Sequence, residues 1–80
     1  MFNLEDISKV KGYTKLTVNA GMFESFLKNF INSWGLEARE TIKPLEIRFV
    51  KERSEKYLRF DYEIYGKKEW LHVTRADNWY

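Results

Sequence analysis

Apolar and polar residues alternate along residues 45–73, and this alternation is the clearest pattern of the sequence. A strict alternation places one set of side chains on each face of a half-buried strand. The pattern predicts three antiparallel strands that are joined by two short connections. One face of the resulting sheet is apolar, and the opposite face carries charged and aromatic side chains.

The middle and last of these strands are predicted to form a tight hairpin. Gly66-Lys67 fits a two-residue turn, because glycine supplies the positive φ that a type II′ turn requires at its first central position. This turn sets the register, which places Asp61 opposite His72 and Glu63 opposite Trp70 on the polar face. The other predicted pairs are Tyr62 with Leu71, Phe60 with Val73 and Arg59 with Thr74.

The first strand of the segment is predicted at residues 45–50. Pro44 stands at its start, where a missing N–H group is tolerated, most easily on an edge strand. The alternation directs Leu45, Ile47 and Phe49 toward the core.

The connection at residues 51–56 is almost entirely charged and has no turn signature, so the register of the first two strands stays open. Opposite charges across neighbouring strands are favourable, whereas like charges that face each other are destabilising. Arg48 is therefore expected near Asp61 or Glu63 rather than opposite Arg59, and the pattern does not choose between the two acids.

An amphipathic helix is predicted at residues 20–34, with Asn19 as its N-cap and Gly35 at the C′ position. Its apolar side chains follow the i, i+3, i+4, i+7 spacing without a break. A stripe of this size must be buried, and the apolar face of the sheet is the available surface. The stripe consists of Met22, Phe23, Phe26, Leu27, Phe30, Ile31 and Trp34.

Shorter elements flank this helix. Asn3 is predicted to cap a short helix at residues 4–11. Alternation at residues 13–18 predicts a short strand with Leu16 and Val18 on one side. Residues 36–41 show no clear period and are expected to be a connector. The predicted fold is α+β, with one amphipathic helix on a mostly antiparallel sheet in the order (α)-β-α-β-β-β.

Size and composition support a single domain that spans residues 1–80. A domain of this size buries only about 60% of the surface that its unfolded chain exposes, so its core must be well filled. The aromatic content of 18% serves this need, because large rings fill a small core efficiently. The sequence contains no cysteine, which excludes disulfides and thiolate chemistry.

Charge and hydropathy indicate which kinds of partner and which cellular location to expect. A net charge of +2 with both signs intermixed is too weak to predict nucleic-acid binding from electrostatics alone. One histidine and dispersed acids show no metal-ligand spacing, and no cofactor is expected. No apolar run approaches the length of a membrane span. The first residues lack the features of a signal peptide, so a cytoplasmic location is expected.

Several aromatic and charged side chains remain on the polar face of the sheet once the core is assigned. Exposed Trp, Tyr and Arg side chains are typical anchors of protein interfaces, and a protein partner is expected. The same rings suit the stacking of unpaired bases, so single-stranded nucleic acid is the alternative partner. Two intramolecular alternatives also stay open, namely coverage of this face by the chain's own tail and pairing of two copies as a homodimer. The predicted partner-binding residues are Tyr57, Arg59, Tyr65, Trp70, His72 and Trp79.

The predicted pairing of His72 with Asp61 suggests a separate hypothesis. A carboxylate that orients an imidazole is half of a general acid–base device, as a small toxin-type ribonuclease would require. No Ser, Cys or second His accompanies this pair in the pattern, and a flat sheet face offers no pocket that excludes water. A cross-strand hydrogen bond is the simpler interpretation, so no catalytic residue is assigned and the protein is expected not to be an enzyme.

Four runs in the second half of the sequence carry a resemblance to known proteins, namely Tyr57-Leu58-Arg59-Phe60, Tyr65-Gly66-Lys67-Lys68, Trp70-Leu71-His72-Val73 and Asn78-Trp79-Tyr80. This half of the sequence resembles small uncharacterised proteins that are encoded by phages and prophages of Gram-positive bacteria. This resemblance implies a stand-alone accessory protein that binds and blocks a host protein, including components of defence systems such as CRISPR–Cas. It implies action in the host cytoplasm by steric inhibition.

Overall fold

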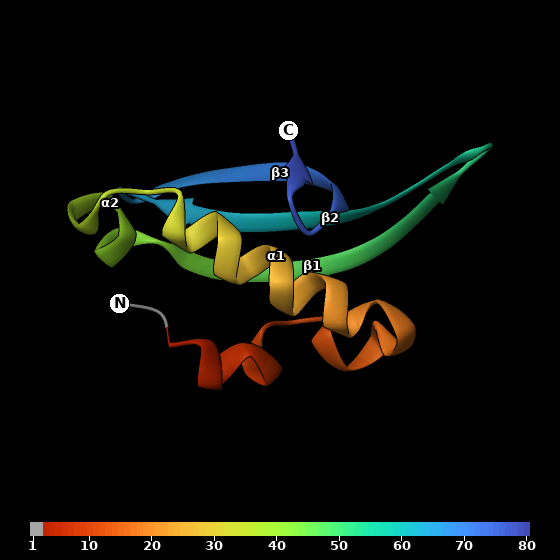
Figure 1. Ribbon diagram of the computed structural model, residues 1–80, viewed down its shortest axis with the longest axis horizontal. Helices are drawn as coiled ribbons and strands as arrows, with labels where there is room; N and C mark the ends of the chain where they lie inside the picture. The colour runs from red at the N-terminus through yellow and green to blue at the C-terminus, as the bar shows by residue number, and fades with distance from the viewer. Residues whose placement is uncertain (1–2) are drawn as a thin grey trace.

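One helix lies across one face of a four-stranded antiparallel sheet in the computed structural model, which describes residues 3–80 (Figure 1). The sheet is a meander with the strand order β1-β2-β3-β4. This arrangement confirms the α+β prediction with a C-terminal meander. The expectation about a targeting segment involves residues 1–2, which lie outside the described part. The elements are η1 (Leu4–Lys9), η2 (Tyr13–Lys15), η3 (Thr17–Asn19), α1 (Ala20–Asn32), α2 (Leu36–Thr41), β1 (Lys43–Glu52), β2 (Glu55–Ile64), β3 (Lys67–Arg75) and β4 (Asn78–Trp79).

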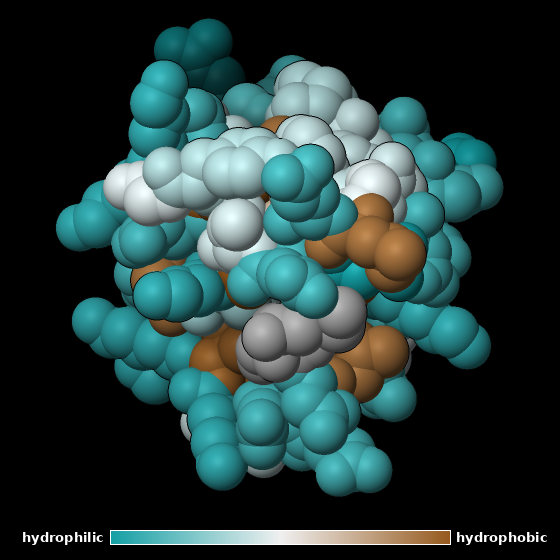
Figure 2. Space-filling model, turned by 90° about the vertical axis from the view of Figure 1, so that its left-hand side faces the viewer, coloured by the Kyte–Doolittle hydropathy of each residue, from teal (hydrophilic) through white to brown (hydrophobic). Residues whose placement is uncertain are grey.

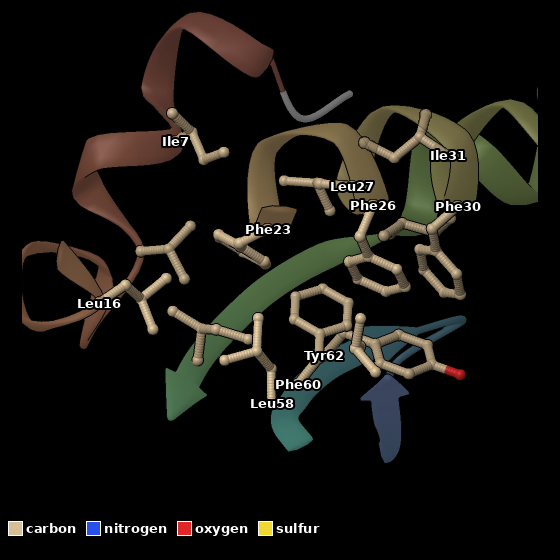
Figure 3. Close-up of a cluster of buried hydrophobic side chains, with 14 of the residues drawn as sticks. Ile7, Leu16, Phe23, Phe26, Leu27, Phe30, Ile31, Leu58, Phe60 and Tyr62 are labelled. Atoms are coloured by element: carbon tan, nitrogen blue, oxygen red, sulfur yellow. The ribbon is translucent and has the colours of Figure 1, made fainter. Parts of the chain in front are cut away.

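The core lies between α1 and the sheet, as the apolar patterns predict (Figure 3). Phe26 and Phe30 of α1 face Phe60 of β2, with ring centroids 5.3 and 5.7 Å apart. These edge-to-face geometries are the ones that aromatic pairs favour. Five of the seven residues in the predicted stripe are buried, while Met22 and Trp34 are partly buried at its ends.

The ends of α1 differ from the prediction. The helix ends at Asn32, and the Ser33 hydroxyl donates a hydrogen bond of 2.6 Å to the Phe30 carbonyl. Gly35 has a φ of −66° and a ψ of 163°, so it is not the left-handed C′ residue that the sequence predicts, and it precedes α2 instead. Asn19 occupies the N-cap position as predicted, but it has helical torsions and its side chain makes no capping hydrogen bond.

Residues 36–41 form the short helix α2 and not an irregular connector. Tertiary contacts stabilise this short segment, as helices of this length require. The Arg39 guanidinium donates a 3.0 Å hydrogen bond to the Trp34 carbonyl. The Thr41 hydroxyl accepts a 3.1 Å hydrogen bond from the N–H of Tyr65, which ties α2 to the turn between β2 and β3.

The N-terminal segment is helical, and the strand predicted at residues 13–18 is wrong. Asn3 caps η1 as expected, because its side chain accepts a 3.1 Å hydrogen bond from the Glu5 N–H. Beyond η1 the chain turns at Gly12, whose φ is +90°, and continues in the two 3-10 turns η2 and η3. These turns bury Leu16 but leave Val18 91% exposed, whereas a strand would have placed both on one side.

The edge strand β1 is longer than predicted and follows the expected alternation only in part. Ile47 is fully buried, but Phe49 remains 47% exposed. A register shift between Pro44 and Glu46 interrupts the ladder with β2 at its beginning. Phe49 lies farther along the strand, where it lines an open cleft beside η2 instead of packing under α1. The predictions that Leu45 and Phe49 join the core are therefore wrong, since Leu45 is only partly buried and also lies outside the core cluster.

The β2–β3 hairpin has a different turn from the one predicted. The two central residues are Tyr65 and Gly66, both with positive φ, 50° and 76°. Positive φ at both positions is the signature of a type I′ turn. The turn therefore lies one residue earlier than predicted, and the strand pairing shifts by two residues. A shift of two preserves the face of every side chain, because the period of a strand is two.

Candidate functional site

The outer face is the face of the sheet that points away from α1. The observed register places Arg48, Arg59 and His72 in one row across β1, β2 and β3. The backbone of Tyr80 continues this row, because it exchanges two hydrogen bonds with His72, of 2.8 and 3.0 Å. The next row contains Glu46, Asp61 and Trp70. The outer face thus brings together residues that come from both ends of the sequence segment 46–80.

His72 is the centre of a continuous group of aromatic rings on this face, which we call the outer ring cluster. Its ring centroid lies 4.6 Å from that of Tyr57, 4.8 Å from that of Trp70 and 4.6 Å from that of Tyr80. The Tyr80 ring stacks on the imidazole with an interplanar angle of 11°. Each of the other two rings is tilted by nearly 50° relative to His72. The cluster consists of Tyr57, Trp70, His72 and Tyr80.

Arg59 connects the outer ring cluster to the charged part of the outer face. Its guanidinium carbon lies 4.3 Å from the centroid of the Trp70 ring, which is a cation–π contact. The same guanidinium donates a 3.2 Å hydrogen bond to the carboxylate of Asp61. The side chain of Arg59 is therefore fixed on both sides, between a ring and a carboxylate.

Arg48 lies opposite Arg59, a pairing that the sequence interpretation disfavoured. Asp61 offsets the repulsion between the two arginines, because one of its oxygens contacts Arg59 and the other lies 3.9 Å from the Arg48 guanidinium. Glu46 also contacts Arg48, at 3.6 Å. Arg48 is thus close to Asp61, as expected, although its direct cross-strand neighbour is another arginine. Each ion pair at an accessible surface of this kind, here between partly buried side chains, contributes about 1 kcal/mol or less, so the network orients side chains more than it stabilises the fold.

A hollow of about 430 Å³ lies beside Trp70 on this side of the sheet. Trp70 and Leu45 supply its apolar lining, and Arg59 and Asp61 supply both signs of charge. A hollow bounded by a ring, an aliphatic side chain and paired charges suits the insertion of a side chain from a partner, since interface anchors commonly fill such pockets. Its remaining lining residues are Lys11, Glu46, Lys68 and Glu69.

The predicted pair of His72 and Asp61 is not formed. In the observed register His72 lies opposite Arg59, and Asp61 lies opposite Trp70. Asp61 is engaged by two arginines, while the imidazole is surrounded by rings. The acid–base device that motivated the ribonuclease hypothesis therefore lacks its carboxylate partner. Among residues 3–80, no group of three or more His, Asp or Glu side chains is arranged to hold a metal ion.

Two of the predicted partner-binding residues lie elsewhere. Trp79 packs on the helix side of the sheet, where its ring lies 5.3 Å from that of Phe26 and 6.0 Å from that of Phe30. Its assignment to the outer face is wrong, because β4 pairs Trp79 with the inward-facing Val73. Tyr65 is 60% exposed in the β2–β3 turn, whereas Trp70 contacts Arg59 and His72.

Figure 2 shows the end of the molecule at which α2 and the β2–β3 turn lie, and its surface is mainly hydrophilic with small separate hydrophobic patches. Tyr65 belongs to this end, because its N–H is bonded to Thr41 of α2. Scattered exposed apolar side chains are normal on a protein surface. Tyr65 is therefore separate from the outer ring cluster, where four rings are in contact.

The sequence interpretation missed Tyr80 as a member of the outer ring cluster and treated it only as a possible cover. The tail reaches the sheet through a short turn in which the Thr74 hydroxyl donates to the Asn78 carbonyl at 3.1 Å. The side-chain amide of Asn29 also donates a 3.1 Å hydrogen bond to the Ala76 carbonyl and ties this turn to α1. The alternation within Trp79-Tyr80 was the available signal, because neighbouring residues of a strand point to opposite faces.

Comparison of the chain with protein-family models, with curated proteins and with solved structures gave no match. The resemblance to phage-encoded accessory proteins therefore stays a prediction from the sequence. Among the residues that the structure describes, none of the helices has the length and apolar character that crossing a membrane requires.

Proposed function

We propose that this chain is a small binding protein that docks on a partner protein through the outer face. The observation that carries the proposal is the outer ring cluster with Arg59, on the side of the sheet opposite to α1. Trp70 is 45% exposed and Tyr80 is 66% exposed, so these two rings of the cluster are accessible. Trp, Tyr and Arg are the residue types that supply most of the binding energy at protein interfaces.

The contacts within the cluster favour binding because they order the side chains in advance. Arg59 is held between Trp70 and Asp61, and Tyr80 is held on His72 by stacking and by backbone hydrogen bonds. Immobilising a flexible side chain costs about 0.5–1.5 kcal/mol at an interface. A cluster that is ordered before binding avoids much of this cost.

The charges of the outer face favour a protein over a polyanion as the partner. Arg48 and Arg59 both contact Asp61, and Arg48 also contacts Glu46. A surface built for phosphates presents arginines and lysines without such carboxylate neighbours. Paired charges around apolar rings match the usual composition of a protein interface, in which a polar rim surrounds aromatic anchors.

The resemblance to phage accessory proteins supports a narrower form of the proposal. In this form the partner is a host protein, such as a component of a defence system, and binding in the host cytoplasm blocks it sterically. The activity of the isolated partner should then fall on addition of the wild-type chain and stay unchanged on addition of a Trp70→Ala variant.

A site-specific cross-linking experiment tests the docking surface even while the partner is unidentified. A photoreactive phenylalanine is placed at Trp70, and a control protein carries it at Lys28, on the exposed side of α1. The expected result is a partner band from position 70 that is absent from position 28 and that excess wild-type protein competes away. The same band from both positions, or a band that wild type does not compete, contradicts the proposal.

Once the partner is captured, single variants measure the contribution of the cluster. We expect Trp70→Ala to weaken binding by about 2 kcal/mol or more, which is roughly 30-fold in Kd. Leu36→Ala is the matched control, because Leu36 is an apolar side chain that is 70% exposed in α2. Equal affinities of the two variants, measured by titration calorimetry, would show that the outer face is not the site.

Single-stranded nucleic acid is the second candidate, and one observation favours it. The outer ring cluster offers several rings on one sheet face, which is the arrangement on which unpaired bases stack. This candidate predicts that oligonucleotides quench Trp70 fluorescence with an affinity that falls steeply with salt, because counterions are released on binding. Titrations of single-stranded DNA and RNA at two salt concentrations distinguish it from protein binding.

A further inference from the structure

The edge of β1 that faces away from β2 is separate from the outer ring cluster. The Ile47 N–H donates a 2.9 Å hydrogen bond to the Lys11 carbonyl on the side of β1 that faces away from β2. In an antiparallel strand, alternate residues direct their N–H and C=O groups to the same side. The backbone groups of Phe49 and Lys51 therefore point to this side as well.

The N-terminal segment pairs with this edge at Ile47, and no further backbone hydrogen bond joins the described N-terminal residues to residues 48–52. The bridge between Lys11 and Glu46 is isolated, and the chain then turns away at Gly12 into η2. The close approach of Gly12 is tight, since an added Cβ would lie 2.1 Å from the Ile47 carbonyl oxygen. Within the described part of the chain, the edge at residues 49–51 is thus open, and an open edge is a template for a further strand.

A cleft of about 410 Å³ lies beside this open edge. Leu16, Ile47 and Phe49 supply its apolar lining, and Phe49 is 47% exposed there. The charged residues around the cleft are three cations and one carboxylate, so its local charge is positive. These residues are Lys11, Lys15, Arg48 and Glu46.

We infer that the open edge of β1 binds an extended acidic segment of a partner polypeptide, which adds to the sheet as a further strand. Main-chain hydrogen bonds to Phe49 and Lys51 would supply affinity, and alternate side chains of the added strand would enter the cleft or meet its cations. Charge complementarity selects the acidic sequence, because Lys11 and Lys15 flank the cleft on the helix side.

The charges argue for a separate polypeptide over a second copy of this chain. The open segment of β1 carries Lys51, and Glu52 and Arg53 follow it. An antiparallel pair of two such segments centred on Lys51 would place the two Lys51 side chains opposite each other, which disfavours self-association. An acidic strand meets no such repulsion.

A pair of model peptides tests the charge preference. The probes are fluorescein-labelled ten-residue peptides, one of alternating Val and Glu and one of alternating Val and Lys. We expect the acidic peptide to bind at least tenfold more tightly by fluorescence anisotropy, and the Phe49 and Lys51 amides to gain protection from hydrogen exchange. Equal binding of both peptides, or protection confined to the outer face, overturns the inference.

Proline at position 51 tests the main-chain pairing. Lys51→Pro removes an N–H that faces away from β2, which an edge strand tolerates. Lys51→Ala is the matched control, because it removes the same charge but keeps the N–H. We expect Lys51→Pro to bind the acidic peptide at least tenfold more weakly than Lys51→Ala, and equal affinities overturn the inference.

Two further variants make the test independent of how well Lys51→Pro folds and of the proposed outer-face function. Exchanging charge with Lys11→Glu and Lys15→Glu together should reverse the preference toward the basic peptide, and an unchanged preference overturns the inference. Trp70→Ala should bind the acidic peptide as wild type does, whatever its effect on the outer-face partner. A concentration-dependent dimer in light scattering that Lys51→Pro abolishes would show instead that a second copy occupies the edge.

Discussion

The two faces of the sheet carry similar rings at similar spacing, but they differ in what covers them. On the inner face Phe60 packs against Phe26 and Phe30 of α1, the three ring centroids lie 5.3–5.7 Å apart, and the three rings are almost completely buried. On the outer face Trp70 and His72 lie 4.8 Å apart, yet Trp70 remains 45% exposed. Ring contacts alone therefore do not distinguish a core from a candidate binding surface, whereas coverage by a second layer does.

The difference has an energetic consequence. Burying an aromatic side chain removes a large apolar area from water, at about 25 cal/mol per Å². The inner rings realise this gain within the chain itself. The outer rings realise only part of it, and the remaining apolar area is available to a partner.

The largest expected effect is the difference in stability between truncations on the two faces. Phe26→Ala should lower the free energy of unfolding by about 3–5 kcal/mol, because it opens a cavity among fully buried rings. Trp70→Ala should lower it by about 1 kcal/mol, since it removes a cation–π contact and ring contacts on an accessible surface. Urea unfolding of both variants measures the two values.

These two measurements test whether the two faces differ in their contribution to the stability of the fold. If Trp70→Ala destabilises the fold as strongly as Phe26→Ala, the outer ring cluster is a second core and not a binding surface. Because a small domain has a total stability of about 5–15 kcal/mol, a loss of 3–5 kcal/mol is easily resolved.

The inner face could be predicted well from the sequence because its signal is periodic and redundant. The α1 stripe and the alternation in β2 each identify the buried side without reference to the other. The strand at residues 13–18 was wrong because two or three alternating residues also fit a pair of 3-10 turns. Gly12 decides between them, since its positive φ and its close approach to Ile47 depend on β1, which lies far away in the sequence.

The outer face was predicted less well because it depends on register. Gly66 fits either the first position of a type II′ turn or the second position of a type I′ turn, and the sequence interpretation chose the former. The assignment of each side chain to a face stayed correct despite this error, but the cross-strand neighbours changed, so that His72 lies opposite Arg59 and not Asp61. Trp79 was misplaced because its pairing with Val73 follows from the tail turn. The predicted site residues that the structure does bring together are Tyr57, Arg59, Trp70 and His72.

The β2–β3 turn contains a residue that lowers the stability of the fold, in contrast to the buried rings of the inner face. Tyr65 occupies a left-handed conformation with a φ of 50°, which costs a residue with a side chain of this size about 1–2 kcal/mol. Asn tolerates this conformation, so Tyr65→Asn should raise the free energy of unfolding by roughly 1 kcal/mol. Tyr65→Phe is the control, because it keeps both the ring and the strain. Thermal and urea unfolding that rank the two variants equally would contradict this account of the turn.

A smaller effect concerns the pH dependence of the free energy of unfolding, to which Tyr62 on the inner face contributes. Burial among the inner rings raises the pKa of the Tyr62 hydroxyl above its ordinary value of about 10, and the nearby carboxylate of Glu69 raises this pKa further. Above about pH 10 the unfolded chain loses the Tyr62 proton while the folded chain keeps it. The contribution of Tyr62 therefore lowers the free energy of unfolding as the pH rises from about 10 toward the pKa that Tyr62 has in the folded state. Below about pH 10 both states are protonated and Tyr62 contributes no pH dependence.

Tyr62→Phe should remove this part of the alkaline decline and leave the stability at pH 7 to 9 with the same pH dependence as in wild type. Glu69→Gln should reduce the decline without abolishing it, because burial is the larger cause of the raised pKa. Urea unfolding of the three proteins from pH 8 upward measures the difference. Parallel curves for wild type and Tyr62→Phe would show that the Tyr62 hydroxyl reaches water freely. In that case the inner face would be less well covered at β2 than the contacts of Tyr62 with Phe30 and Phe60 imply.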